Sequence, residues 1–235
     1  MNKFSDALRS QVGRKVLTGL TGLALIGFVI VHLLGNLVLL TQDKDAFNGY
    51  AQTLHGLGPL LYAAELGLLI IIIAHACIGI SIFMKKSKAR GSRYAVQASA
   101  GSTSHQTLSS RTMAISGTAL LVFIVLHIMH FKFGSFEASD VNRDIMLNGK
   151  PAEDIYSRVA EAFTDIKVVG LYVFAMLMLG FHLRHGFWSA FQSLGIAFPR
   201  YSRSLYALGV FTAIILALGF LMIPIYLYVA QTCLS

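Results

Sequence analysis

Five long apolar stretches dominate this sequence and restrict what it can fold into. Each is close to the roughly 20 residues with which an α-helix crosses the hydrocarbon core of a membrane. The composition agrees, since 55% of the residues are hydrophobic, only 13% are charged and the mean hydropathy is +0.66. We therefore predict an all-α membrane protein, a single membrane domain over residues 1–235, in which the first four of five transmembrane helices form a bundle. The predicted helices run approximately over 16–40, 60–84, 112–131, 168–190 and 205–230.

Charged residues are distributed unevenly between the connecting segments. If the N-terminus lies inside, the inner segments hold 13 of the 19 Lys and Arg residues with one acid, Asp6, and the outer segments hold nine of the 11 acids. This is the positive-inside rule, and it predicts an inner N-terminus and an outer C-terminus. The net charge of +8 thus reflects topology, and a nucleic-acid partner is not expected. The inner basic residues are Lys3, Arg9, Arg14, Lys15, Lys85, Lys86, Lys88, Arg90, Arg93, Arg111, Arg184, Arg200 and Arg203, and the outer acids are Asp43, Asp45, Glu137, Asp140, Asp144, Glu153, Asp154, Glu161 and Asp165.

The inner segments are a basic lead, residues 1–15, and a Ser-rich basic linker, residues 85–111. The linker is either a connector held by anionic lipid headgroups or a docking surface for a soluble partner. The first apolar stretch is too long for a cleaved signal peptide and has no clear cleavage site. Cys77 and Cys233 lie near opposite faces, so no disulfide is expected.

The outer segments are a short loop, residues 41–59, and a longer segment, residues 133–166. In the longer segment, Pro151 is expected to open an amphipathic helix on the outer surface. The apolar face of this helix would carry Ile155, Val159, Ala162 and Phe163.

Four histidines lie inside the first four apolar stretches, one in each. An ionisable residue inside a membrane is costly to place and indicates a functional site. At 1.5 Å per residue from the flanking charges, His32 and His127 fall in the outer half of the membrane, and His75 and His182 fall in the inner half. The four residues therefore form two pairs, each at one depth.

Two histidines at one depth on facing helices are the ligand set of a b-type haem. Zinc would require three or four ligands at one point, often with Cys or carboxylate. The plainer alternative is that each histidine bonds a neighbouring helix; four depth-matched histidines favour two haems. His130 and His185 each lie three residues beyond a preferred ligand, in H-x-x-H spacing, and are alternatives to His127 and His182.

The contexts of these histidines resemble the cytochrome b subunit of succinate:quinone oxidoreductases, in the five-helix, dihaem branch shared by succinate dehydrogenases and fumarate reductases. The resemblance covers essentially the whole chain. It rests on V-H-L-L-G-N-L at 31–37, A-H-A-C-I-G at 74–79, V-L-H-I-M-H-F at 125–131, G-F-H-L-R-H-G-F-W-S-A-F-Q at 180–192, and the entry Ser10, Arg14, Lys15 before L-T-G-L-T-G-L.

The resemblance implies that His32 and His127 ligate the iron of an outer haem b, and His75 and His182 that of an inner haem b. It implies a flavoprotein subunit that interconverts succinate and fumarate, as in the tricarboxylic acid cycle, and an iron–sulfur subunit that delivers electrons. This chain would anchor both subunits at the inner face of a bacterial inner membrane and serve a quinone, expected to be menaquinone. The dicarboxylate active site would lie on another chain.

Quinone needs polar groups near the outer haem, and Gln52, His55 and Glu65 are the candidates. A carboxyl such as Glu65, about one turn inside the second helix, must be protonated or partnered. Some family members carry protons through a glutamate shortly before the last haem ligand. Gly180 occupies the position two before His182, so that route is not expected here.

Other classes of protein share parts of this pattern. A dihaem cytochrome b of a quinone-linked hydrogenase or formate dehydrogenase would have the same haem count with different partners. A transporter that uses intramembrane histidines would have broken helices, but only Pro224 interrupts a span, the fifth. A structural anchor without a cofactor is the remaining alternative.

Overall fold

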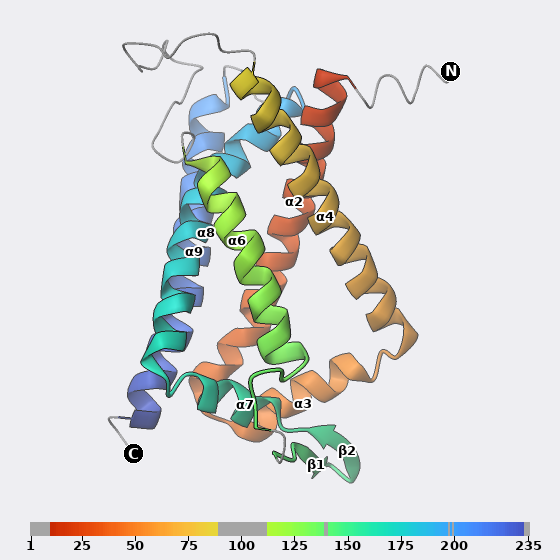
Figure 1. Ribbon diagram of the computed structural model, residues 1–235, viewed down its shortest axis with the longest axis vertical. Helices are drawn as coiled ribbons and strands as arrows, with labels where there is room; N and C mark the ends of the chain where they lie inside the picture. The colour runs from red at the N-terminus through yellow and green to blue at the C-terminus, as the bar shows by residue number, and fades with distance from the viewer. Residues whose placement is uncertain (1–9, 89–111, 139–140, 197, 199, 233–235) are drawn as a thin grey trace. The chain divides into compact units, whose positions relative to one another are not determined.

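The computed structural model describes residues 10–88, 112–138, 141–196, 198 and 200–232 (Figure 1). Five long helices dominate it, and their bounds agree with the predicted spans to within a few residues. Together with the turn that continues the third helix to Lys132, all five are long and apolar enough to cross a membrane, which indicates a multi-pass membrane protein. They are α2 (Gln11–Asn36), α4 (Pro59–Lys88), α6 (Met113–His127), α8 (Ile166–Ser193) and α9 (Ser202–Thr232).

Apolar side chains are exposed along these helices. On α4, for example, Leu66, Ile70 and Ile73 expose 58%, 59% and 52% of their surface. Lipid chains can cover such surface, and a helix satisfies its backbone hydrogen bonds internally where water is absent. The absence of water inside a membrane thus accounts both for the helical form and for the exposed apolar faces.

Two of the long helices end in a turn of different geometry. Helix α2 continues into the 3₁₀ turn η1 (Leu37–Thr41), and α6 continues into the π-helical turn η2 (Ile128–Lys132). In η2 the backbone N–H of Phe133 donates to the carbonyl oxygen of Ile128, five residues earlier, at 3.2 Å. Such π turns are rare and often occur at functional sites.

The chain forms two compact units, and each long helix contributes residues to both. Of the described residues, unit 1 contains those within 1–28, 67–118 and 178–215, and unit 2 contains those within 29–66, 119–177 and 216–235. Each unit contains one of the predicted histidine pairs: His75 and His182 belong to unit 1, and His32 and His127 belong to unit 2.

The prediction of a loop over residues 41–59 is wrong. Most of this segment is helix α3 (Lys44–His55), which begins after Asp43. The Asp43 side chain accepts a hydrogen bond from the backbone N–H of Ala46 at 2.9 Å and so satisfies one of the free donors at the helix start.

The prediction that Pro151 opens a helix is also wrong. Pro151 lies in strand β2 (Lys150–Glu153), which pairs antiparallel with β1 (Asp144–Leu147). The connecting residues Asn148 and Gly149 have φ of 52° and 72°, as a tight hairpin turn requires. The expected amphipathic helix exists, but it is α7 (Ile155–Ala162), and Asp154 caps it.

Helix α3, the hairpin β1–β2 and helix α7 pack together within unit 2, and we name them the α3–α7 cluster (Figure 1). Its centre is polar. Asn48, fully buried, donates to Asp154 at 3.0 Å and accepts from the backbone N–H of Tyr156 at 2.9 Å. Burial raises the pKa of the Asp154 carboxyl, but hydrogen bonds from Lys44, Asn48 and Ser157 outweigh it and lower that pKa to about 2.

A second polar group joins this cluster to the end of η2. Arg158, only 7% exposed, donates to Glu137 at 2.9 Å and to the carbonyl oxygen of Phe131 at 3.3 Å. Arg143 contacts Glu137 at 2.8 Å and Glu161 at 2.6 Å. The hydrogen bond with Glu161 is the main cause that raises the pKa of Arg143, and it lowers the pKa of Glu161.

Three predictions concern residues outside those that the structure describes. They are the first nine residues of the basic lead, residues 89–111 of the inner linker, and Cys233 with its expected lack of a disulfide.

Candidate functional site

The histidine pair of unit 1 brings two helices together. His75 on α4 and His182 on α8 have ring centres 6.3 Å apart, with their planes at 71°. The Nδ1 atom of His75 lies 3.1 Å from the hydroxyl of Thr21, and the Nδ1 atom of His182 lies 3.2 Å from the hydroxyl of Ser116. Each ring is therefore held by a hydroxyl from a third or fourth helix.

The two halves of this pair repeat one local arrangement. The hydroxyl residue is followed by a glycine in both helices, Gly22 after Thr21 and Gly117 after Ser116. A Cβ atom at either glycine would meet the Cε1 atom of the adjacent histidine at 3.2 Å, closer than most real contacts. The glycine thus allows the ring to lie directly against the helix, while its neighbour supplies the hydrogen bond.

The histidine pair of unit 2 lies among aromatic rings. His32 on α2 and His127 at the end of α6 have ring centres 5.8 Å apart, with their planes at 89°. The Nδ1 atom of His127 lies 3.2 Å from the hydroxyl of Tyr172 on α8, and the Nδ1 atom of His32 lies 3.5 Å from the amide nitrogen of Asn36. Phe220 and Phe123 stand beside the two rings, at 5.8 Å from His32 and 5.6 Å from His127.

In the pair of unit 1, these contacts are compatible with a metal bound at the other ring nitrogen. In a metal-ligating histidine, one nitrogen typically donates its proton to a neighbour while the other binds the metal. The hydroxyls of Thr21 and Ser116 each already donate to a backbone carbonyl on their own helix, so their lone pairs can accept from Nδ1. With the proton on Nδ1, Nε2 would be the atom that binds a metal.

The spacing of the rings suits one shared metal. A ligating imidazole nitrogen lies about 2 Å from its metal, so two nitrogens on opposite sides lie about 4 Å apart and their ring centres about 6 Å apart. The two pairs, at 6.3 and 5.8 Å, fit this arrangement. Within the described residues, no group of three or more His, Cys, Asp or Glu side chains could hold a metal ion.

The alternative histidines occupy different surroundings. His130 lies in η2, where its ring stacks on Phe131 with centres 4.5 Å apart and meets the edge of Phe136 at 5.3 Å. His185 lies one turn beyond His182 on α8 and is half-buried. Arg184, between them, donates from Nη2 to the hydroxyl of Tyr206 at 3.2 Å; its buried Nε has no hydrogen-bond partner among the described residues.

The three quinone candidates lie on two helices, Gln52 and His55 on α3 and Glu65 on α4. Gln52 donates from its amide to the hairpin carbonyls of Leu147, Lys150 and Pro151 at 3.2 to 3.4 Å, so it holds β1–β2 against α3. His55, in the last turn of α3, is exposed. Glu65 on α4 forms an ion pair with Lys132 in η2. The carboxyl is therefore partnered, as its position required.

Sequence reasoning did not single out Thr21, Ser116 or Tyr172. A hydroxyl residue directly before a glycine in two apolar stretches was the available signal for Thr21 and Ser116. Tyr172 had no such signal, because its contact with His127 depends on how α8 is rotated.

A scan of protein-family models, a search of curated proteins and a search of solved structures find no match to this chain.

Proposed function

We propose that this chain is the dihaem cytochrome b subunit that anchors a succinate dehydrogenase or fumarate reductase complex in the membrane. His75 and His182 would ligate the iron of an inner haem, and His32 and His127 the iron of an outer haem. The observation that carries the proposal is the spacing of the two pairs, 6.3 and 5.8 Å between ring centres, which matches two imidazoles on one iron.

The surroundings of the pairs support this ligand role. Thr21, Ser116 and Tyr172 would accept a hydrogen bond from Nδ1 and orient the rings, as the outer partners of metal ligands do. Arg184, two residues after His182, has a buried donor without a hydrogen-bond partner among the described residues and is a candidate for a haem propionate. A bound haem supplies one-electron transfer, and the chain supplies ligation, orientation and local charge.

The wider assembly follows from the charge pattern and the resemblance in sequence. The N-terminus would be cytoplasmic and the C-terminus outside the inner membrane of a bacterium. A flavoprotein subunit would carry the succinate and fumarate chemistry, and an iron–sulfur subunit would pass electrons to this chain. Menaquinone would react on the outer side, with Glu65, His55 and Gln52 as candidate polar groups.

The test is the haem content of the purified chain. A pyridine haemochrome assay against protein concentration is expected to give two haems per chain, and a reduced-minus-oxidised visible spectrum to show b-type bands. No haem, or zinc in place of iron, would end the proposal. In native membranes, reduction of these haems by succinate supports the proposed complex; reduction by formate or hydrogen alone would assign the chain to the other dihaem class.

Single replacements test the ligand assignment. His127→Ala and His182→Ala are each expected to remove one haem and leave the other. The matched variants His130→Ala and His185→Ala are expected to retain both haems with a shifted spectrum or potential. Loss of a haem in the second set and not in the first would reverse the assignment.

A further inference from the structure

The second half of the fifth helix, α9, packs within unit 2 against the part of α2 that carries His32. A Cβ atom at Gly219 would lie 2.7 Å from Cδ2 of Leu33, closer than real contacts of this kind, and Leu33 is buried. Beyond the end of α2, the amide of Gln42 donates to the hydroxyl of Tyr226 at 2.7 Å. Two contacts about two turns apart on α9 therefore hold this helix against α2 and the residues that follow it.

A continuous apolar face of α9 provides the rest of this packing. Leu216, Ile223 and Leu227 expose 3%, 5% and 0% of their surface. Together with Phe220 they follow the i, i+4, i+7, i+11 spacing of one side of a helix. The face that packs inward thus brings the ring of Phe220 to His32, where the ring centres are 5.8 Å apart and the planes are tilted by 32°.

The other histidine of the outer pair has a phenylalanine in the same relation to it. The ring centre of Phe123 lies 5.6 Å from that of His127, and the planes are tilted by 31°. These separations are within the range at which neighbouring aromatic rings attract one another. Phe123 lies one turn before His127 on α6, so the helix that carries this histidine also carries its phenylalanine. Phe220 comes from a helix that carries none of the four predicted ligands.

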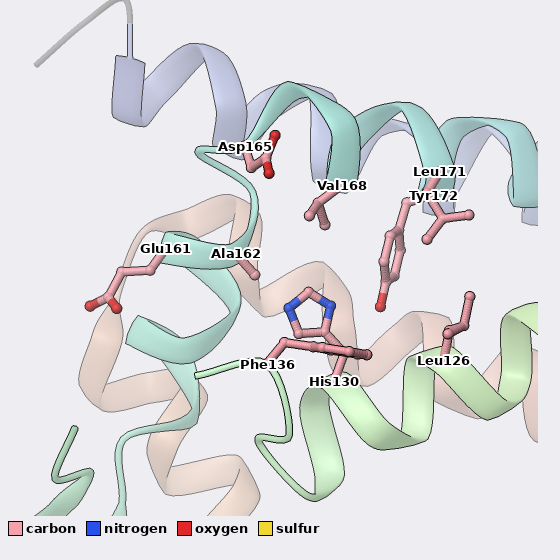
Figure 2. A pocket seen from close by; sticks show the side chains of 9 residues that line it. All are labelled: Leu126, His130, Phe136, Glu161, Ala162, Asp165, Val168, Leu171 and Tyr172. Carbon is pink, nitrogen blue, oxygen red and sulfur yellow. The ribbon is translucent and has the colours of Figure 1, made fainter. Parts of the chain in front are cut away.

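The polar contacts of the two histidines differ. The Tyr172 hydroxyl lies 3.2 Å from Nδ1 of His127, and Figure 2 shows Tyr172 directed from α8 toward α6. At His32 the corresponding contact is with the amide nitrogen of Asn36, at 3.5 Å, and this nitrogen donates to the backbone carbonyl oxygen of His32 at 2.8 Å. An amide nitrogen donates and does not accept, so it cannot receive a proton from Nδ1. The ring of Phe220 is a different kind of neighbour, which restricts rotation of the imidazole by contact.

We propose that Phe220 is a positioning residue for the outer pair: its ring holds the His32 imidazole with its plane perpendicular to that of His127. The observed angle between the two imidazole planes is 89°. Groups packed around metal-ligating histidines fix the orientation of the rings and so tune the metal. The choice of haem iron as that metal rests on the proposed function. The inference gives the fifth helix a part in a site whose predicted ligands come from the first and third spans.

The test is the EPR spectrum of the oxidised full chain in lipid nanodiscs, because the signal of a low-spin ferric haem depends on the angle between its two imidazole planes. Phe220→Leu removes the ring and is expected to shift the signal of the outer haem, which is identified by its loss in His127→Ala. After reduction, the share of outer haem that binds carbon monoxide should rise about tenfold, as is typical when a metal ligand loses an outer partner. Gly219→Ala, which displaces Leu33 or α9, should have both effects with the ring still present. The matched control is Phe211→Leu, the same replacement on the same helix at a ring that is 61% exposed, and it should have neither effect.

The inner haem, measured in every variant, shows that the chain is folded. An outer signal and carbon monoxide binding that stay unchanged in both Phe220→Leu and Gly219→Ala would refute the role of Phe220, as would equal changes in Phe211→Leu. The haem count separates this inference from the proposed function, which fails if the chain holds no haem. In that case NMR of the full chain with labelled histidine tests the contact directly. The ring signals of His32 should shift in Phe220→Leu and not in Phe211→Leu, and unchanged signals would overturn the inference.

Discussion

Removing the hydroxyl of Thr21 is expected to raise the midpoint potential of the inner haem. In Thr21→Val the side chain keeps its shape and loses the group 3.1 Å from Nδ1 of His75. The hydrogen bond makes the imidazole a stronger donor to iron, which stabilises the more positive ferric state. Without it the ferric state loses stability, and the potential rises.

The size of the shift follows from the hydrogen bond. One such bond contributes about 0.5–1.5 kcal/mol. For a one-electron couple 59 mV corresponds to about 1.4 kcal/mol, so the potential should rise by about 20–65 mV. Ser116→Ala removes the equivalent contact to His182 and should shift the same haem in the same direction.

The assay is a redox titration of the visible haem bands, with two controls. Thr18→Val also removes a hydroxyl from α2, but this hydroxyl donates at 2.9 Å to the carbonyl of Arg14 on the same helix, so no shift is expected. Thr21→Ser keeps the hydroxyl and should restore the original potential. An unchanged or lowered potential in Thr21→Val, or a shift confined to the outer haem, would refute the reasoning.

Four further predictions concern three separate parts of the molecule. Gly117→Ala brings a methyl group to 3.2 Å from the His182 ring, so the ring must move by a few tenths of an ångström. We expect lower occupancy of the inner haem and an intact outer haem, measured by the pyridine haemochrome assay. The pKa of Asp154 is about 2 in the folded chain, below its ordinary value, so its contribution to stability is complete above about pH 4 and is lost as pH falls through 2. Thermal unfolding, followed by a fluorophore on the hairpin, should show this loss of stability. In Asp154→Asn this pH dependence should be absent. Asp154→Ala leaves the fully buried Asn48 amide without its acceptor and should lower the free energy of unfolding by about 1–3 kcal/mol. In Glu65→Gln the side chain still forms hydrogen bonds but cannot carry a proton. Both haems should therefore assemble, and quinone turnover, measured with succinate, should fall. Normal turnover would remove Glu65 from the proton path.

The long helices could be predicted because their signal is strong and local. An uninterrupted stretch of some 20 apolar residues predicts a membrane-spanning α-helix, and the charges in the segments between the stretches predict the orientation of each helix across the membrane. The α3–α7 cluster could not be predicted in this way, because its strands have four residues each and its helices are short. The Asn148–Gly149 pair was a usable hairpin signal, and reading it would have excluded a helix at Pro151.

For the candidate site, the sequence identified the histidines and not their partners. Depth along a helix follows from counting residues, so His32 with His127 and His75 with His182 could be paired before the structure was known. The partners depend on rotation about each helix axis, which uniform apolar faces do not encode. The contact of Tyr172 therefore emerged only from the packing, and for Thr21 and Ser116 the glycine that follows each was the one sequence signal.

The π turn η2 has a consequence for how the histidines of α6 relate to each other. A turn closed by a bond from residue i to i+5 holds one residue more than an α turn, so η2 acts as a single-residue insertion directly after His127. In an uninterrupted α-helix His130 would lie about 60° round the axis from His127. The wider turn carries it further round the axis, to where its ring meets Phe136 and away from the face that meets His32. Deleting Ile128 or Met129 would make Phe131 the third residue after His127, the position that His130 now has. Two histidines three residues apart therefore need not point the same way when a π turn follows the first of them.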